Sequence, residues 1–406
     1  MELNNLIEQS TFLNKYKYLL KLYKLEDLNL NLILKHYRRN LNNYFLNYHV
    51  TKSNIENLKN EIIFLIFLSL HCNNINQEEA SRLWSLICKN ILSKIFDNYL
   101  STKYKDYKKY FFVIGMGKIG VKDLNFTSDI DLIIFFDSKN SPYELYEFNK
   151  SIKALIGNIS NISPTFFHKI DLRLRPDLGN SFIVTDMEDA IDYYSSIGRN
   201  WERLAFYRSC FLCGDISLYY YFKSSISSFL FRRSFDYYAI DEVKKLFSVK
   251  HESKSLDIKN SYGFIRSCEN ILHFNQLLWS GKFKEIRENN IHKLFNILSK
   301  YDFIIDPKEL IVVKNAYYFF RRIENYLHIK QNIFQNIVTD DDNFLALSVK
   351  DYVSELQVKS HQIINICEKL FTNDESKKDI NYNLFNDKSK QIKKNRRGVF
   401  NNKKYI

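Results

Sequence analysis

Apolar residues recur along this chain with two different periods, and the change between them separates helical regions from strands. From the N-terminus to about residue 100 they return every three or four positions, as in residues 55–72 and 80–96. This spacing predicts amphipathic helices. The same spacing returns after about residue 185, most clearly in residues 309–331 and 353–371, and predicts a helical bundle.

Between residues 110 and 185 the pattern is that of a small sheet. Residues 110–120 read as a strand entering a glycine turn, residues 129–137 as a buried strand, and residues 166–176 as a third strand ended by a proline. A helix is expected between the last two strands, over residues 141–160, because helical spacing follows a Ser-Pro start. The sequence therefore predicts a mainly helical α+β fold around a small mixed β-sheet.

Four regions follow from these patterns. They are an N-terminal helical segment (1–105), a core that contains the sheet (106–220), a C-terminal helical bundle (221–375) and a basic tail (376–406). The tail has no hydrophobic periodicity and is expected to be disordered. The chain has only 10 Gly and 4 Pro, which agrees with long helices that have few breaks.

The formal net charge of +13 suggests a nucleic-acid partner until its distribution is considered. Eight Lys or Arg and no acid lie between residues 388 and 404, so the tail carries most of the excess. A terminal basic run is usually a solvated segment. Nucleic acid is therefore not expected as a partner.

The cysteines and the N-terminus indicate a cytoplasmic protein without a membrane partner. The six Cys are scattered, and Cys210 and Cys213 form a single CxxC without a second pair, so reduced thiols are expected. The first residues include acids and amides where a signal peptide needs an apolar core. The longest apolar run, residues 62–68, is too short to span a bilayer.

The glycines of the first turn, Gly115, Gly117 and Gly120, match the GxGxxG pattern of dinucleotide-binding folds. That pattern must open a helix long enough to cross to a parallel strand. Only residues 121–128 separate the turn from the next strand, which argues against this use. A glycine turn also lets backbone N–H groups approach a triphosphate, with Lys118 available as a point charge.

Two acids, Asp129 and Asp131, stand where the buried strand begins. Side chains at i and i+2 share a strand face, so these carboxylates project together. Two ionised carboxylates this close repel each other, and burying one without compensation is costly. A divalent cation would remove both problems, whereas two solvated acids at an exposed strand start are the alternative.

The third expected strand adds charged residues to the same site. Alternation places Asp171, Arg173 and Arg175 on one of its faces. Three carboxylates can hold two Mg²⁺ ions, and arginines can bind phosphate oxygens through two hydrogen bonds. A solvent-facing Asp/Arg ladder is the alternative, but the neighbouring glycine turn and paired acids favour phosphoryl-transfer chemistry.

Three segments, residues 115–136, 170–176 and 192–215, resemble in order and spacing the bacterial glutamine synthetase adenylyltransferase / adenylyl-removing enzymes. That family belongs to the DNA-polymerase-β-like nucleotidyltransferases. Its members usually carry this unit twice, with one half removing AMP from a glutamine synthetase tyrosine and the other attaching it. This chain holds one copy, and residues 193–203 are more similar to the removing half.

The resemblance implies a role for each matching residue. Asp129, Asp131 and Asp171 would be the catalytic, metal-binding acids. The nucleotide and its phosphates would be bound by Gly115, Gly117, Lys118, Ser128, Arg173 and Arg175, and the site would be supported by Arg199, Trp201, Glu202, Arg203, Lys259, Arg266 and Glu269. The implied cofactor is Mg²⁺, as two ions, with ATP or ADP as the nucleotide. The implied partners are glutamine synthetase and a PII-type signalling protein.

Departures from the family pattern keep alternatives open. In residues 257–270, Phe264 stands where the family has a glycine and Ser267 where it has an acid. The resemblance implies an enzyme that removes AMP by phosphorolysis, attaches it from ATP, or does both. A catalytically impaired binding homologue and a nucleotidyltransferase with another acceptor, such as RNA, are the alternatives.

Overall fold

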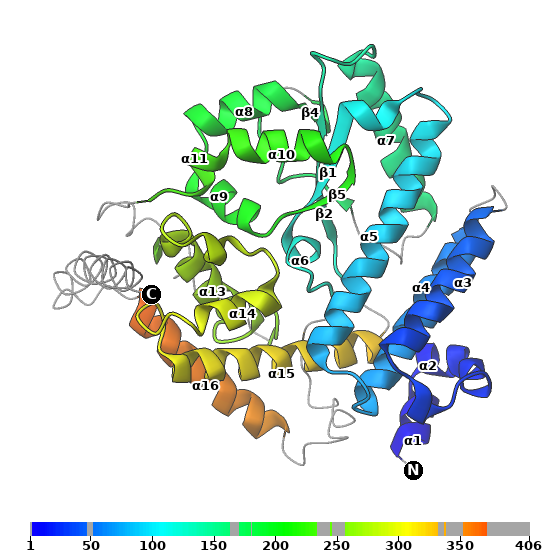
Figure 1. Cartoon of the computed structure of the whole chain (residues 1–406). Coiled ribbons are helices and arrows are strands. Elements are labelled where there is room, and N and C mark those ends of the chain that lie inside the picture. Colours follow the sequence, from blue (N-terminus) through cyan, green and yellow to red (C-terminus); the bar gives the residue numbers. More distant parts are fainter. Residues whose placement is uncertain are drawn as a thin grey trace, which may run out of the picture.

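The computed structural model describes residues 2–46, 52–162, 170–179, 181–233, 244–245, 256–331, 337 and 352–371. The predicted tail, residues 376–406, lies outside the described residues. Within them the chain is mainly helical around a small mixed sheet, so the predicted fold class is confirmed (Figure 1).

The N-terminal region is helical, as its periodicity predicted. It contains α1 (Glu2–Gln9), α2 (Thr11–Tyr16), α3 (Leu30–Leu46), α4 (Lys52–His71) and α5 (Gln77–Ser101), with 3-10 turns η1 (Lys17–Lys21), η2 (Leu25–Asp27) and η3 (Tyr107–Tyr110). A capping box starts α5: Asn76 Oδ1 accepts from the Glu79 N–H, and the Glu79 carboxylate accepts from the Asn76 N–H. In Figure 1, α5 runs from the sheet to the other N-terminal helices.

The sheet has five strands: β1 (Phe111–Gly115), β2 (Ile130–Phe136), β3 (Ile170–Asp171), β4 (Val184–Asp186) and β5 (Cys210–Gly214). The strand order is β3-β2-β1-β5, and β4 also pairs with β2. β1 is antiparallel to β2 and β5, whereas β2 is parallel to β3 and β4. Because β1 and β2 are antiparallel, the glycine turn opens no parallel crossover; it forms the single-turn helix α6 (Gly117–Gly120). The argument against a dinucleotide-binding fold is confirmed.

The two faces of the sheet pack against different apolar clusters. Along β2, the even-numbered residues 130–136 join the main core, whereas Ile133 and Phe135 join a second cluster. That second face is covered by α8 (Met187–Ser196), α10 (Ile216–Ser225) and α11 (Ser227–Leu230) (Figure 1). Since side chains alternate along a strand, Asp131 lies on this second face, at the start of β2.

The helix expected over residues 141–160 is confirmed as α7 (Leu145–Ile162). The third strand was predicted over residues 166–176, but among the described residues of this range only Ile170 and Asp171 form a strand. β3 ends at Asp171, because the Asp171 carboxylate accepts a hydrogen bond from the Arg173 N–H at 2.9 Å and turns the chain. Arg173 and Arg175 therefore do not share a strand face with Asp171. After residue 185, where helical spacing was expected to return, the chain forms two short helices, α8 and α9 (Asn200–Tyr207). The strand β5 follows them and was not predicted from the periodicity.

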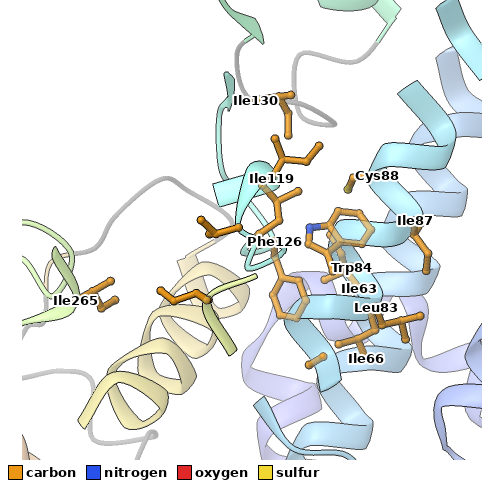
Figure 2. Packing of buried hydrophobic residues seen from close by; sticks show 14 of the residues in the cluster. Ile63, Ile66, Leu83, Trp84, Ile87, Cys88, Ile119, Phe126, Ile130 and Ile265 are labelled. Carbon is orange, nitrogen blue, oxygen red and sulfur yellow. The ribbon is translucent and has the colours of Figure 1, made fainter. Parts of the chain in front are cut away.

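The C-terminal region contains α13 (Ile265–Trp279), η4 (Lys284–Arg287), α14 (Ile291–Leu298), α15 (Pro307–Gln331) and α16 (Tyr352–Phe371). Figure 1 shows α15 extending from α13 and α16 to α5, below the sheet in that view. One apolar cluster joins the N-terminal helices, one sheet face and these helices. Figure 2 shows part of it, where the Phe126 ring lies below Ile119 in that view and next to the indole of Trp84 on α5. The boundaries predicted for the four regions stay predictions.

Neither a disulfide nor a membrane-spanning helix is found among the residues that the structure describes. All six cysteines are described, and none forms a disulfide. Of the helices in the described ranges, none combines the length and apolar character needed to cross a bilayer.

Candidate active site

A cavity of about 410 Å³ opens where the end of the sheet meets α9 and α13. It brings together residues that are far apart in the sequence. The predicted site residues that line it are Gly117, Lys118, Ser128, Asp129, Asp131, Asp171, Arg173, Trp201, Lys259, Arg266 and Glu269. The remaining lining residues are Leu174, Leu204, Ala205, Arg208 and Ile265.

The acids lie side by side at one end of the cavity. Asp131 and Asp171 are register partners in the parallel pair of β2 and β3, so their side chains share a face. Burial and the carboxylates of Asp171 and Asp129 raise the pKa of Asp131 to about 6, against the opposing effect of Arg208 and Lys259. The positive charges of Arg208 and Lys259 are therefore too weak at this position to offset burial and the two neighbouring carboxylates.

The glycine turn closes directly over the Asp131 carboxylate. Gly117 has φ +58°, and a Cβ at this position would lie 2.5 Å from Asp131 Oδ2. The next residue back, Met116, donates its N–H to the Asp131 carbonyl oxygen at 2.8 Å. Glycine is needed at 117 for both its conformation and this close approach.

The two arginines after β3 point to different places. The Arg173 guanidinium lies over the Asp171 carboxylate, with Nη2 at 2.5 Å and Nε at 2.8 Å from Oδ2, and its side chain is 81 % exposed. Arg175 donates to the carbonyl oxygens of Phe182 and Leu172 and lines a neighbouring cavity of about 330 Å³ together with Arg173. The expectation that both arginines face the acids is therefore wrong for Arg175.

The acids fit a divalent cation that arrives with a phosphate ligand. Among the residues that the structure describes, no three His, Cys, Asp or Glu stand ready to share one ion. Mg²⁺, however, is commonly held by one or two carboxylates, with water and substrate phosphates completing its shell. Asp131 and Asp171, with Asp129 beside them, provide such carboxylates. A cation would offset the burial and the carboxylate repulsion that raise the pKa of Asp131.

Lys118, predicted as a phosphate contact, lines the cavity but is almost fully buried. Its Nζ lies 3.1 Å from Oε1 of Glu324 on α15. Burial and the nearby Arg321 lower the pKa of Lys118 to about 8, although Glu324 acts in the opposite direction. The sequence showed the lysine but gave no sign of this partner.

The opposite wall comes from α9 and from residues 257–270. Glu269 is buried, and Arg208 Nη2 lies 3.1 Å from its Oε2. Burial alone would raise the pKa of Glu269, yet Arg208 and Lys118 hold it below its ordinary value. Sequence reasoning missed Arg208, which directly follows α9 and lines the cavity together with Trp201 at the start of that helix.

The two departures from the family pattern do not line the cavity. The Phe264 ring packs on Phe320, with 5.1 Å between centroids. Ser267 Oγ accepts a hydrogen bond from the Gly263 N–H at 2.9 Å and so supports the turn before α13. Both replacements therefore belong to the packing behind the wall.

Besides Arg175, four predicted residues lie outside the cavity lining and support neighbouring elements instead. Glu202 accepts from the Arg199 N–H at 2.8 Å and from Tyr193 Oη at 2.9 Å, which fixes the start of α9. The buried Arg203 donates from Nε to the Phe229 carbonyl oxygen at 2.7 Å. The fourth, Gly115, ends β1, where a Cβ would press on Ile119 at 3.0 Å.

The comparison with protein families agrees with this geometry. Residues 5–225 match the family model of glutamate-ammonia ligase adenylyltransferase. The chain belongs to this family. The matched residues include the whole sheet, the acids of β2 and β3, and α9, whereas the wall formed by residues 257–270 lies beyond them.

Several curated proteins similar to this chain are named bifunctional glutamine synthetase adenylyltransferase/adenylyl-removing enzyme. That of Bartonella henselae is 28 % identical over 276 residues, which cover 64 % of this chain and 28 % of the relative. That of Rhizobium meliloti is 30 % identical over 233 residues, or 53 % of this chain and 23 % of the relative. That of Idiomarina loihiensis is 29 % identical over 273 residues, or 64 % and 29 %. The chain thus matches about a quarter of the length of these family members.

Proposed function

We propose that this chain is a Mg²⁺-dependent nucleotidyltransferase that removes AMP from an adenylylated tyrosine of glutamine synthetase. The observation that carries the proposal is the cavity, in which paired carboxylates face a cationic wall beside a glycine turn. Membership of the glutamate-ammonia ligase adenylyltransferase family and the names of the curated relatives support the same substrate. Residues 193–203 resemble the adenylyl-removing half, which favours removal over attachment.

The proposed reaction is phosphorolysis. An oxygen of inorganic phosphate attacks the AMP phosphorus, a new P–O bond forms, and the bond from phosphorus to the tyrosine oxygen breaks. The products are ADP and the free tyrosine hydroxyl, which takes up a proton. In the attaching direction the tyrosine hydroxyl would attack the α-phosphorus of ATP, release pyrophosphate and lose its proton.

The charged residues of the cavity would bind the metal ions and the phosphates. Asp129, Asp131 and Asp171 would hold Mg²⁺, which when bound would neutralise phosphate charge and favour attack at phosphorus. Two ions are proposed, with ADP or ATP as the nucleotide. Arg173 and the cations of the opposite wall, Lys259 and Arg266, would bind phosphate oxygens of the nucleotide and of the attacking phosphate.

The apolar wall is suited to the nucleotide base. Leu174, Trp201, Leu204 and Ala205 line the cavity together, and Trp201 is 38 % exposed. An indole offers a flat face for stacking on a purine, an interaction worth about 1–3 kcal/mol per base. We place the adenine here and the phosphates at the acids.

A PII-type protein is a further proposed partner.

The test is to incubate the chain with Mg²⁺, inorganic phosphate and adenylylated glutamine synthetase and to measure ADP. Release of ADP that Asp129→Asn or Asp131→Asn abolishes would support the proposal. Release that persists in both variants would contradict the assignment of the acids. Binding of ADP with no transfer in either direction would instead indicate a binding homologue.

A further inference from the structure

One carboxylate on α15 fastens both ends of the loop that forms the glycine side of the cavity. Glu324 is fully buried, and its Oε1 accepts hydrogen bonds from Lys118 Nζ at 3.1 Å and from Asn125 Nδ2 at 2.7 Å. Lys118 lies at the start of residues 117–128 and Asn125 near their end. The loop is therefore tied to a helix that follows it by about two hundred residues.

A second residue of α15 holds the middle of the same loop. Arg321 Nε lies 2.9 Å from Asp123 Oδ2, and its Nη2 donates to the Asp123 carbonyl oxygen at 2.7 Å. Arg321 also pairs with Glu324 one helical turn away. We call Lys118, Asp123, Arg321 and Glu324 the loop network; its two positive and two negative groups balance each other in a buried setting.

The ends of this loop adjoin the acids of β2. Ser128 Oγ donates to Asn125 Oδ1, and Ser128 directly precedes Asp129. At the other end, the Asp131 carboxylate lies where a Cβ of residue 117 would stand. A shift of the loop would therefore move the groups on both sides of the acids.

We propose that Arg321 and Glu324 are positioning residues for the nucleotide site. Neither side chain lines the cavity. By fixing residues 117–128 from behind, they hold the glycine turn and Ser128 in the arrangement that receives a nucleoside diphosphate with its divalent cation. The inference rests on the proposed function for the identity of this ligand. A purely structural role of the network is the competing explanation.

The test compares two variants with a control on the same helix. The double variant Arg321→Met with Glu324→Gln removes one charge of each sign. It abolishes the contacts of Arg321 with Asp123 and leaves Lys118 and Asn125 with a neutral acceptor, while the cavity lining stays intact. The single variant Glu324→Gln keeps an acceptor oxygen but leaves Asp123 as the one acid of the loop network that faces Lys118 and Arg321. The control is Glu309→Gln, also on α15. It breaks a surface ion pair in which Glu309 Oε1 lies 2.6 Å from Lys369 Nζ on α16.

The measurements are thermal unfolding and binding of ADP to the full chain with and without Mn²⁺. At a temperature where all variants are folded, the double variant is expected to bind Mn²⁺–ADP at least about tenfold more weakly than the wild type, because charge-assisted ties to the loop are lost. Glu309→Gln is expected to bind as the wild type does. The same weakening is expected for the single variant Glu324→Gln. If the double variant does not fold, binding by the single variant tests the positioning role.

Several outcomes separate the two proposals. Mn²⁺–ADP binding equal to wild type in a folded double variant, or in a folded Glu324→Gln variant, would overturn the positioning role. If the wild-type chain binds Mn²⁺–ADP but releases no ADP from adenylylated glutamine synthetase, the proposed function fails, and the binding comparison still decides the positioning role. Absence of Mn²⁺–ADP binding by the wild type would overturn both.

Discussion

Replacing Gly117 by alanine tests the contact between the glycine turn and Asp131. The new Cβ would lie 2.5 Å from Asp131 Oδ2, whereas ordinary van der Waals contact begins at 3.4 Å. The carboxylate or the turn must therefore move by roughly 1 Å, and a misplacement of that size costs about a hundredfold in rate. The φ of +58° adds strain of about 1–2 kcal/mol for a residue with a Cβ. We expect a modest loss of stability and a large loss of activity.

The assay is the initial rate of ADP release from adenylylated glutamine synthetase, with urea denaturation measured in parallel. Two glycines supply matched controls. Gly179→Ala has the same kind of strain, φ +71°, but nothing within 4 Å of the new Cβ. Gly157→Ala also meets nothing within 4 Å, has no positive φ and lies inside α7, where alanine favours the helix by about 0.5–1 kcal/mol.

The three variants separate strain from the steric contact. If the reasoning holds, Gly117→Ala and Gly179→Ala lose similar stability, but only Gly117→Ala loses about a hundredfold in rate. A Gly117→Ala protein that releases ADP at the wild-type rate while losing stability would refute the contact as a determinant of activity.

Three further predictions concern Asp131, Trp201 and the basic tail. Because burial and nearby carboxylates raise the pKa of Asp131 to about 6, the native state binds this proton more tightly than the unfolded state, and the ionised group lowers stability above pH 6. Asp131→Asn is thus expected to raise the free energy of unfolding without Mg²⁺ by up to about 3 kcal/mol at pH 8 and by little at pH 4, because each pKa unit corresponds to about 1.4 kcal/mol. The same variant should abolish ADP release, and an equal gain in stability at both pH values in urea denaturation would contradict the reasoning. Trp84 and Trp279 are buried and Trp201 is exposed, so Mg²⁺–ADP should change the fluorescence of Trp201; Trp201→Ala should weaken ADP binding by about tenfold or more, and Trp201→Phe by less. Deleting the residues after Lys388 should leave ADP release unchanged, and a loss would assign the basic tail a role in the reaction.

The extent to which the sequence predicted the site depended on how local each determinant was. The buried run of β2 and the acids before it could be predicted because strand alternation is fixed by neighbouring residues. The prediction of the third strand failed because the Asp171 carboxylate accepts a hydrogen bond from the backbone N–H two residues later, which ends the extended conformation. Hydrophobic periodicity indicates which faces of an element are apolar. It does not indicate where a carboxylate accepts a hydrogen bond from a nearby backbone N–H and ends a strand.

Long-range partners were beyond prediction from patterns. The position of Lys118 in the turn suggested a free positive charge for phosphate, yet Glu324 lies 206 residues later and pairs with it. Arg208 was missed for a similar reason, because its partner Glu269 belongs to another helix. Each of these residues has an ordinary local context, and only the packing of α9, α13 and α15 around the sheet assigns its neighbour.

The segment around Phe264 and Ser267 shows why departures from a motif must be located before they are interpreted. As sequence, the two replacements suggested damage to the helical side of the site. In the structure, Lys259, Ile265, Arg266 and Glu269 line the cavity, whereas the replaced positions pack behind it. On α13, residues 265, 266 and 269 share one side because they are one and four positions apart, and residue 267 faces away. The cationic wall and its buried carboxylate are therefore retained, and the question of activity now rests on whether this wall and the acids of β2 and β3 act on one nucleotide.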